Sequence, residues 1–298
     1  MFIMANSTTL LVEGLRFAEG PRWHDGRLYF SDFFDHRVRA VALDGTVTDI
    51  VDVAHQPSGL GWLPDGRMLV VSMIDQKVMR LEPDGALVEH ADVSSTAEFW
   101  VNDMLVDRFG RAYVGNFGFD LDRLIEEGGY GAILNDPDAL ATRIALVQPD
   151  GTVSVAADRM LFPNGTVLTS DGRTLIVAET IALRLTAFDV ADDATLTNRR
   201  VWADLSADLI SPDGIAIDRD DCVWVANAIA PEVVRVAEGG AVLDRVTTSQ
   251  NAFACALGGP DGTTLFACTA PTSTATEVEH VRNGRIEIAT VEIPARVS

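Results

Sequence analysis

Short apolar segments rich in β-branched residues alternate along the whole chain with tight polar turns, and one strand–turn–strand phrase recurs six times. It reads HDGRLYF at 24–30, PDGRMLV at 64–70 and RFGRAYV at 108–114. Asp-Gly between apolar runs favours a β-hairpin, because the turn requires a positive φ. The turn centres are Gly26, Gly66, Gly110, Gly172, Asp221 and Gly262, separated by 40 to 62 residues.

A second hairpin is predicted after each of these turns, for example at 38–50, 78–90 and 279–289. Each repeat then contains four strands of about five residues, which is a usual strand length. Four strands in six repeats predict an all-β fold, a single six-bladed β-propeller over residues 1–298. One small sheet cannot cover both of its faces, whereas a closed ring of sheets buries them against neighbours. Two β-sandwiches are the alternative, but they do not account for the repeat.

The interval between the third and fourth turns is the longest, and residues 118–141 interrupt the repeat there. Leu121, Leu124 and Ile125 have helical spacing, and Asp120 stands where a helix N-cap is expected. We therefore predict a short helical insertion and a loop over one end of the ring. Two roles stay open at this point, a lid over a site and a structural connector.

Composition and charge narrow the classes of partner. Hydrophobic residues make up 47% of the chain, and no apolar run approaches the ~18 residues of a membrane helix. The formal net charge of −21 disfavours a nucleic-acid partner, which requires a basic surface. The three cysteines show neither zinc-site spacing nor a disulfide pattern, and the first residues lack a basic signal region. We expect a cytoplasmic protein that binds a small-molecule substrate, and neither nucleic acid nor membrane.

Aligning the six copies on their turns identifies one position that precedes a glycine in four of them. Its occupants are Glu19, Ser58, Asn102, Asn164, Asp213 and Ala254. Equivalent positions of a propeller form a ring around its axis, so five oxygen-bearing side chains are expected to converge there. Two carboxylates and two amides form an oxygen-only site for one divalent cation, Ca²⁺ first, with Mn²⁺, Mg²⁺ or Zn²⁺ as alternatives. The other interpretation is that these residues cap strands and turns.

Further polar residues are expected near the same level. Asp103 directly follows Asn102, and Asn116 and Asn227 stand six residues after their turn centres. We interpret these two asparagines as strand-end hydrogen-bond partners, with the orientation of metal ligands as the alternative. No GxSxG motif supports a Ser-His-Asp triad, and no glycine-rich phosphate-binding motif occurs.

Four longer phrases resemble the SMP-30/gluconolactonase/LRE-like family and keep the order of its motifs. They are FAEGPRW at 17–23, VNDMLVDRFGRAYVGNFG at 101–118, FPNGTVLTSDGRTLIVAET at 162–180 and SPDGIAIDRDDCVWVAN at 211–227. The resemblance implies a six-bladed propeller with one functional divalent cation at its centre. It also implies lactonase activity, with calcium-dependent phosphotriesterases among the relatives.

The resemblance assigns roles to residues of the predicted ring. Glu19, Asn164 and Asp213 correspond to metal ligands, and Asn102 corresponds to a residue that contacts the substrate or the metal. Asp213 is also the expected base, and Asp103 is the less favoured alternative.

Two positions depart from the sugar-lactone members of that family. Those members usually carry an arginine two residues before the asparagine of the Asn-Asp pair and a glycine after the pair, where this chain has Trp100 and Met104. Tryptophan and methionine favour a more apolar pocket, and Phe117, Phe119 and Tyr130 of the insertion are candidates to line it. The expected substrate-binding residues are Asn102, Trp100, Met104 and Phe119.

These observations predict a metal-dependent hydrolase of a lactone or related ester, with a substrate more apolar than a sugar lactone. The cation would polarise the carbonyl group, and Asp213 would accept a proton from water. A phosphotriesterase-like or epoxide-opening hydrolase at the same site is the second hypothesis. A non-enzymatic interaction propeller is the third, and it has no need of acidic residues on the axis.

Overall fold

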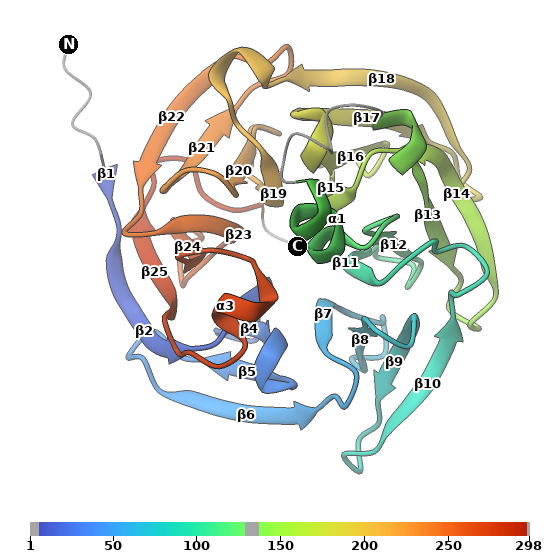
Figure 1. Cartoon of the computed structure of the whole chain (residues 1–298), viewed down its shortest axis with the longest axis horizontal. Helices are drawn as coiled ribbons and strands as arrows, with labels where there is room; N and C mark the ends of the chain where they lie inside the picture. Colours follow the sequence, from blue (N-terminus) through green and yellow to red (C-terminus); the bar gives the residue numbers. More distant parts are fainter. Residues whose placement is uncertain (1–5, 129–136, 297–298) are drawn as a thin grey trace.

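The computed structural model describes residues 6–128 and 137–296, which form six blades arranged in a ring (Figure 1). Each blade is a four-stranded antiparallel sheet, so the six-bladed propeller predicted from the repeat is confirmed. The first two blades consist of β3 (Ala18–His24), β4 (Arg27–Asp32), β5 (Arg37–Val41), β6 (Val47–Asp52), β7 (Pro57–Trp62), β8 (Met68–Ser72), β9 (Lys77–Leu81) and β10 (Leu87–Asp92).

The next three blades repeat this order from the innermost strand outward. The third and fourth consist of β11 (Val101–Val106), β12 (Ala112–Asn116), β13 (Thr142–Val147), β14 (Val153–Met160), β15 (Pro163–Leu168), β16 (Thr174–Glu179), β17 (Arg184–Val190) and β18 (Leu196–Asp204). The fifth consists of β19 (Pro212–Ile217), β20 (Val223–Asn227), β21 (Glu232–Val236) and β22 (Val242–Thr247), and β1 (Asn6–Ser7) pairs in parallel with β22.

The sixth blade joins the two ends of the chain. Its inner strands are β23 (Asn251–Gly258), β24 (Thr264–Ala270) and β25 (Gly284–Thr290), and its outer strand is β2 (Thr9–Leu15). The second hairpin predicted at 279–289 is therefore wrong, because only β25 forms there and α3 (Ala275–Val278) precedes it. Pairing the N-terminal strand into the last sheet closes the ring, and closure leaves no free end blade.

Large side chains fill the interfaces between neighbouring blades. Trp224, Tyr113, Phe30 and Phe266 are each at most 1% exposed. Trp23 of the first blade stacks on Phe266 of the sixth, with ring centroids 5.4 Å apart. Such interfaces are packed as densely as other protein interiors, so the blades hold the residues near the axis in fixed positions.

Every innermost strand is irregular near its first residues. The register of each inner hairpin shifts after Glu19, Pro57, Val101, Pro163, Pro212 or Ala252. In the third blade, for example, Asn102 and Asp103 together face the single residue Gly115 of β12. A bulge of this kind redirects side chains that a regular strand would alternate between its two faces.

The insertion in the third repeat contains α1 (Leu121–Gly128) and a short 3₁₀ helix (Pro137–Leu140). The backbone N–H of Arg123 donates to Asp120 Oδ1 at 3.1 Å, so the predicted N-cap is confirmed. Figure 1 shows α1 near the centre of the ring, at the end of the propeller toward the viewer. Tyr130, which the sequence proposed as a pocket residue, lies outside the described residues.

No described helix is long and apolar enough to span a membrane. The three cysteines are free thiols, as their spacing predicted. The cytoplasmic location and the absence of a nucleic-acid partner stay predictions from the sequence.

Candidate active site

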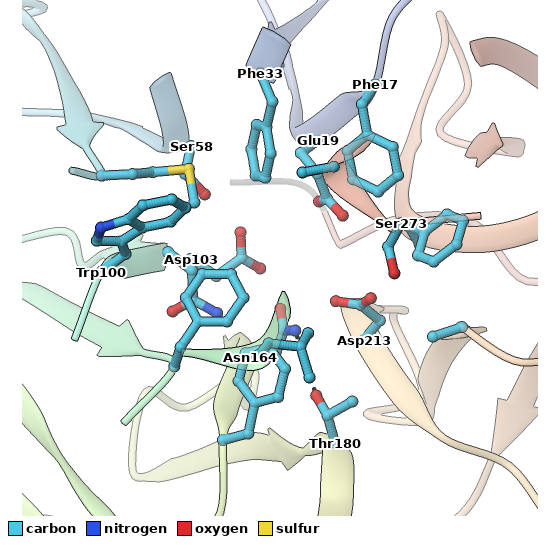
Figure 2. Close-up of a pocket in the computed structure, with 18 of the residues that line it drawn as sticks. Phe17, Glu19, Phe33, Ser58, Trp100, Asp103, Asn164, Thr180, Asp213 and Ser273 are labelled. Carbon is cyan, nitrogen blue, oxygen red and sulfur yellow. Dashed lines mark hydrogen bonds between the residues drawn. The ribbon is translucent and has the colours of Figure 1, made fainter. Parts of the chain in front are cut away.

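A cavity of about 520 Å³ opens at the centre of the ring, on the side where α1 and α3 lie. All five oxygen-bearing ring residues line it, although each comes from a different blade. Figure 2 shows Glu19, Asp103, Asn164 and Asp213 directed toward a common space. The lining residues of the ring are Glu19, Ser58, Asn102, Asn164 and Asp213.

Glycines beside the ring residues allow the innermost strands to approach one another. A Cβ atom on Gly59 would lie 2.3 Å from the backbone nitrogen of Met104. A Cβ atom on Gly214 would lie 2.7 Å from the Cα atom of Ala254. Neither position can accept a larger residue without moving a neighbouring strand. The glycine after the ring residue is thus needed for close packing of the innermost strands, and this packing brings the polar ring side chains close to one another.

The third copy replaces this glycine with Asp103, and so adds a third carboxylate to the site. Asp103 and Asn102 are each 4% exposed and both line the cavity. Consecutive residues of a regular strand point to opposite faces, and the bulge in β11 is what permits both to reach the same space.

The carboxylates of the site destabilise one another's charge. Burial, followed by the charges of Asp213 and Asp103, raises the pKa of Glu19 well above its usual value. Burial and the charge of Asp103 likewise raise the pKa of Asp213 well above its usual value. Burial also raises the pKa of Asp103. The guanidinium of Arg22, which donates to the carbonyl of Met104 at 2.8 Å, opposes the shifts at Asp103 and Glu19 without reversing them. Its single positive charge does not balance three buried carboxylates.

The ring residues fit a hard divalent cation. Asn102 Oδ1 is buried and has no hydrogen-bond partner among the described residues. The Nδ2 group of Asn164 donates to Thr180 Oγ1 at 3.3 Å, which leaves its carbonyl oxygen as an acceptor. An oxygen without a partner beside mutually repelling carboxylates is the chemistry of a Ca²⁺ or Mg²⁺ site.

A cation at this place would need amide as well as carboxylate ligands. In the parts of the chain that the structure describes, no three His, Cys, Asp or Glu side chains form a group that could hold an ion alone. The predicted mixed set of Glu19, Asn102, Asn164 and Asp213 is consistent with that finding, because half of its ligands are asparagines.

Asn116 and Asn227 do not line the cavity. Asn116 donates to the carbonyl of Arg143 at 2.8 Å and accepts from Thr142 at 2.6 Å. Asn227 accepts from the backbone N–H of Ser211 at 3.0 Å. Both residues tie strand ends to neighbouring segments, so their interpretation as strand-end hydrogen-bond partners is confirmed.

The apolar residues expected at the site divide into two groups. Trp100 and Phe117 line the cavity. Met104 is fully buried in the core and does not line the cavity, so the structure places it outside the substrate space. The bulge explains this difference, because it directs Asn102 and Asp103 into the cavity and returns Met104 to the interface with the second blade. Phe119 is not among the lining residues either, and it packs edge-on against the lining residue Phe162 with centroids 6.0 Å apart.

Sequence analysis missed most of the aromatic wall, although the repeat contained a signal for it. Residues two positions before the ring position line the cavity in five copies, and residues seven after the turn centre line it in four. The first set is Phe17, Gln56, Trp100, Phe162 and Ser211, and the second is Phe33, Met73, Phe117 and Ala228. Ser273, Ala275 and Glu279 also line the cavity, but they lie in the irregular sixth repeat and had no such signal.

The cavity lining is acidic and aromatic. None of the described lining residues is a lysine, arginine or histidine. The lining carboxylates are Glu19, Asp103, Asp120, Asp122, Asp213 and Glu279, and the lining aromatic residues are Phe17, Phe33, Phe34, Phe99, Trp100, Phe117, Phe162 and Phe253. An apolar body without negative charge fits such a surface.

Comparison with known proteins identifies the family. The profile of the SMP-30/Gluconolactonase/LRE-like region matches residues 17–271. The pentonolactonase XacC of Haloferax volcanii is 25% identical over 268 residues, which cover 88% of this chain and 84% of that protein. Regucalcin of Danio rerio is 27% identical over 183 residues, which cover 60% of this chain but only 57% of the length of regucalcin.

A solved structure agrees with this assignment at the level of the fold. The calcium-binding protein regucalcin of Agrobacterium tumefaciens superposes with a TM-score of 0.78 and 19% identity, over 99% of this chain and 96% of that one. The match of the profile extends over most of the chain and includes Glu19, Asn102, Asn164 and Asp213. The chain therefore belongs to the SMP-30/gluconolactonase/LRE-like family.

Proposed function

We propose that this protein is a metal-dependent hydrolase of lactones or related esters, with a substrate more apolar than a sugar lactone. The observation that carries the proposal is the meeting of Glu19, Asn102, Asn164 and Asp213, from four blades, in one cavity. The name pentonolactonase for a relative that aligns over 88% of this chain supports the reaction type.

Four of the five lining ring residues have a role in this chemistry. Glu19, Asn102, Asn164 and Asp213 would hold one divalent cation, Ca²⁺ first among the candidates. A cation bound there supplies a Lewis acid for the carbonyl oxygen of the substrate. Burial keeps bulk water away from these groups, which strengthens every electrostatic interaction in the site.

Hydrolysis also needs a group that takes a proton from the attacking water. The Asp213 carboxylate is the proposed acceptor, because it lines the cavity beside the other proposed cation ligands and points into the space that they share. Asp103 lines the same cavity and is the second candidate. Attack of water on the carbonyl carbon breaks the ring C–O bond, and the products are a carboxylate and a hydroxyl group on one molecule.

The walls above the ring support an apolar substrate. Trp100 stacks on Phe99 with centroids 5.0 Å apart, and Phe117 packs against Phe162 at 4.7 Å. Phe17 and Phe253 form a third aromatic contact at 4.9 Å. Aromatic faces bind apolar and aromatic groups, whereas a polyol requires a hydrogen-bond partner for each of its hydroxyl groups, and these six aromatic side chains offer few.

The first test is the metal content of the purified protein, followed by assays of a substrate panel. We expect about one divalent cation per chain, a melting temperature lowered by EDTA, and lactone hydrolysis that returns on adding Ca²⁺, Mn²⁺, Mg²⁺ or Zn²⁺. An aryl-substituted lactone should exceed a sugar lactone in kcat/KM by about tenfold. Aryl phosphotriesters and epoxides in the same panel separate the alternative reactions. Protein that retains no cation, melts alike with EDTA and Ca²⁺ and hydrolyses no lactone would contradict the proposal.

A further inference from the structure

The wall just above the ring is built from one equivalent residue of each blade. Phe17, Gln56, Trp100, Phe162 and Ser211 stand two residues before their ring residues, and all five line the cavity. Three of them are aromatic, so the wall is mainly apolar. The two polar members therefore decide which substrate groups can hydrogen-bond there.

Ser211 has its hydrogen bonds within the protein. Its Oγ donates to the carbonyl of Thr180 at 3.2 Å, and its backbone N–H donates to Asn227 Oδ1 at 3.0 Å. Ser211 is thus a structural link between the fourth and fifth blades, with no donor left for a ligand.

Gln56 differs from Ser211 in this respect. It is only 8% exposed, and its side-chain amide makes no hydrogen bond to any described residue. Because Gln56 lines the cavity, its amide is accessible from that space, and a bound molecule can take the place of water as its hydrogen-bond partner. The cavity is where its donor and acceptor can be satisfied.

The backbone fixes the position of Gln56. Its φ is +64°, in the left-handed region that few residues other than glycine adopt, and Phe162 has the same conformation with a φ of +57°. Both residues precede a proline at the start of an innermost strand. The carbonyl of Gln56 accepts from the N–H of Met73 at 2.8 Å, which holds the segment in place. Residues kept in a rare conformation by their surroundings concentrate at ligand sites.

Aromatic neighbours stand on both sides of Gln56. Its blade lies between the blades of Phe17 and Trp100 around the ring. A group that hydrogen-bonds Gln56 therefore belongs to a molecule whose remaining surface meets aromatic rings. An anionic group is disfavoured, because the described lining contains no basic side chain to balance it, and the neutral amide of Gln56 is suited to a neutral polar group.

We propose that Gln56 is a specificity-determining residue whose amide hydrogen-bonds a neutral polar group, such as a hydroxyl, on the non-reacting part of an aromatic substrate. This inference rests on the proposed lactone hydrolysis. It narrows the substrate class from an apolar lactone to an aromatic lactone with one hydrogen-bonding substituent distant from the reacting carbonyl.

The test compares γ-phenyl-γ-butyrolactone with its three ring-hydroxylated isomers. For wild-type protein, at least one isomer should exceed the parent lactone in kcat/KM. In Gln56→Leu, the ratio of kcat/KM for that isomer to kcat/KM for the parent should fall by at least about tenfold. Gln56→Met is the second variant if leucine impairs folding.

Gln250→Leu is the matched control. Gln76 has a backbone conformation similar to that of Gln56, with a φ of +55°, but its amide donates to the carbonyl of Phe99 at 2.7 Å, and Phe99 lines the cavity. The amide of Gln250 instead donates to the carbonyl of Asn283 at 3.0 Å, and neither of these two residues lines the cavity. Its loss should leave the substrate ratio unchanged. A ratio that stays within about twofold for every isomer in folded Gln56→Leu would overturn the inference.

A binding measurement separates this inference from the proposed function. If no lactone is hydrolysed, the proposed function fails. Binding can still be measured with the corresponding hydroxyphenyl lactams, because a lactam is hydrolysed far more slowly than a lactone. Calorimetry should then show at least about tenfold weaker binding of one lactam isomer to Gln56→Leu than to wild-type protein. Equal binding, or no binding of any lactam to wild-type protein, would contradict the assignment of Gln56.

Discussion

Glu19 and Glu179 are both buried glutamates, but their surroundings are opposite. Glu19 lines the cavity, and burial together with Asp213 and Asp103 raises its pKa well above the usual value. Glu179, at the end of β16, is fully buried and accepts hydrogen bonds from Arg184, Thr186 and the N–H of Leu161. Burial alone would raise the pKa of Glu179, but these partners outweigh it and lower the pKa.

The difference separates structural from functional acidic residues in this fold. Glu287 of the sixth blade resembles Glu179, because it accepts from Ser249 and Thr269, and its pKa is also lowered against the effect of burial. These carboxylates have their hydrogen-bond partners inside the protein. The ring carboxylates instead face one another, which is why we propose that a cation from outside the chain is their partner.

Replacing Asp213 by Asn should have the largest effect. Loss of the proposed proton acceptor is expected to lower kcat/KM for a lactone by about 10²–10⁴-fold. The same variant should melt no earlier than wild-type protein in EDTA, because it removes a buried charge that the charge of Asp103 repels. Steady-state kinetics and thermal melting measure the two effects, and Asp208→Asn at an exposed position is the control. Near wild-type turnover by Asp213→Asn would remove Asp213 from the mechanism.

Glutamine substitutions at the two glutamates sharpen the comparison directly. Glu179→Gln should lower the free energy of unfolding by about 2–3 kcal/mol, because it leaves two arginines without their partner. The loss stays below the largest values found when a buried ion pair is broken, because Arg184 and Arg199 are 29% and 33% exposed and water screens their charges. Glu19→Gln should cause no loss when EDTA is present, and it should abolish stabilisation by the cation. Urea unfolding with EDTA and with Ca²⁺ measures both variants, and equal losses would contradict the distinction.

The pH dependence of stability should have opposite signs at the two sites. Stability from Glu179 is present above the usual glutamate value of 4.5 and is lost as pH falls toward its lowered pKa. The contribution of Glu19 in EDTA-treated protein is fully present below 4.5 and is lost as pH rises through its raised pKa.

Each group changes the slope by at most about 1.4 kcal/mol per pH unit, so this effect is the smallest. Urea unfolding from about pH 3 to about pH 8 should show an acid arm that Glu179→Gln flattens and a neutral arm that Glu19→Gln flattens. If both substitutions flatten the same arm, the pKa values of Glu19 and Glu179 are not shifted in opposite directions, and the comparison fails.

The repeat explains both what could be predicted and where prediction failed. Equivalent positions of a closed ring face its axis, so Glu19, Asn164 and Asp213 could be grouped without coordinates. The same reasoning failed at 279–289, because ring closure takes its outer strand from the N-terminus. It failed again at Met104, because a bulge two residues earlier changes which side chains face inward.

By itself, the sequence determined the ring of blades and the types of residue around its axis, since both follow from a local pattern repeated six times. Only the tertiary structure decided which buried polar groups have partners. Glu19 and Glu179 are the same residue type, and Gln56 and Gln76 share a backbone conformation, yet one of each pair is satisfied within the protein and the other is not. These partners lie on other strands or loops, such as Leu161 for Glu179 and Phe99 for Gln76, and the packing of those segments rather than the local sequence brings them within hydrogen-bond distance.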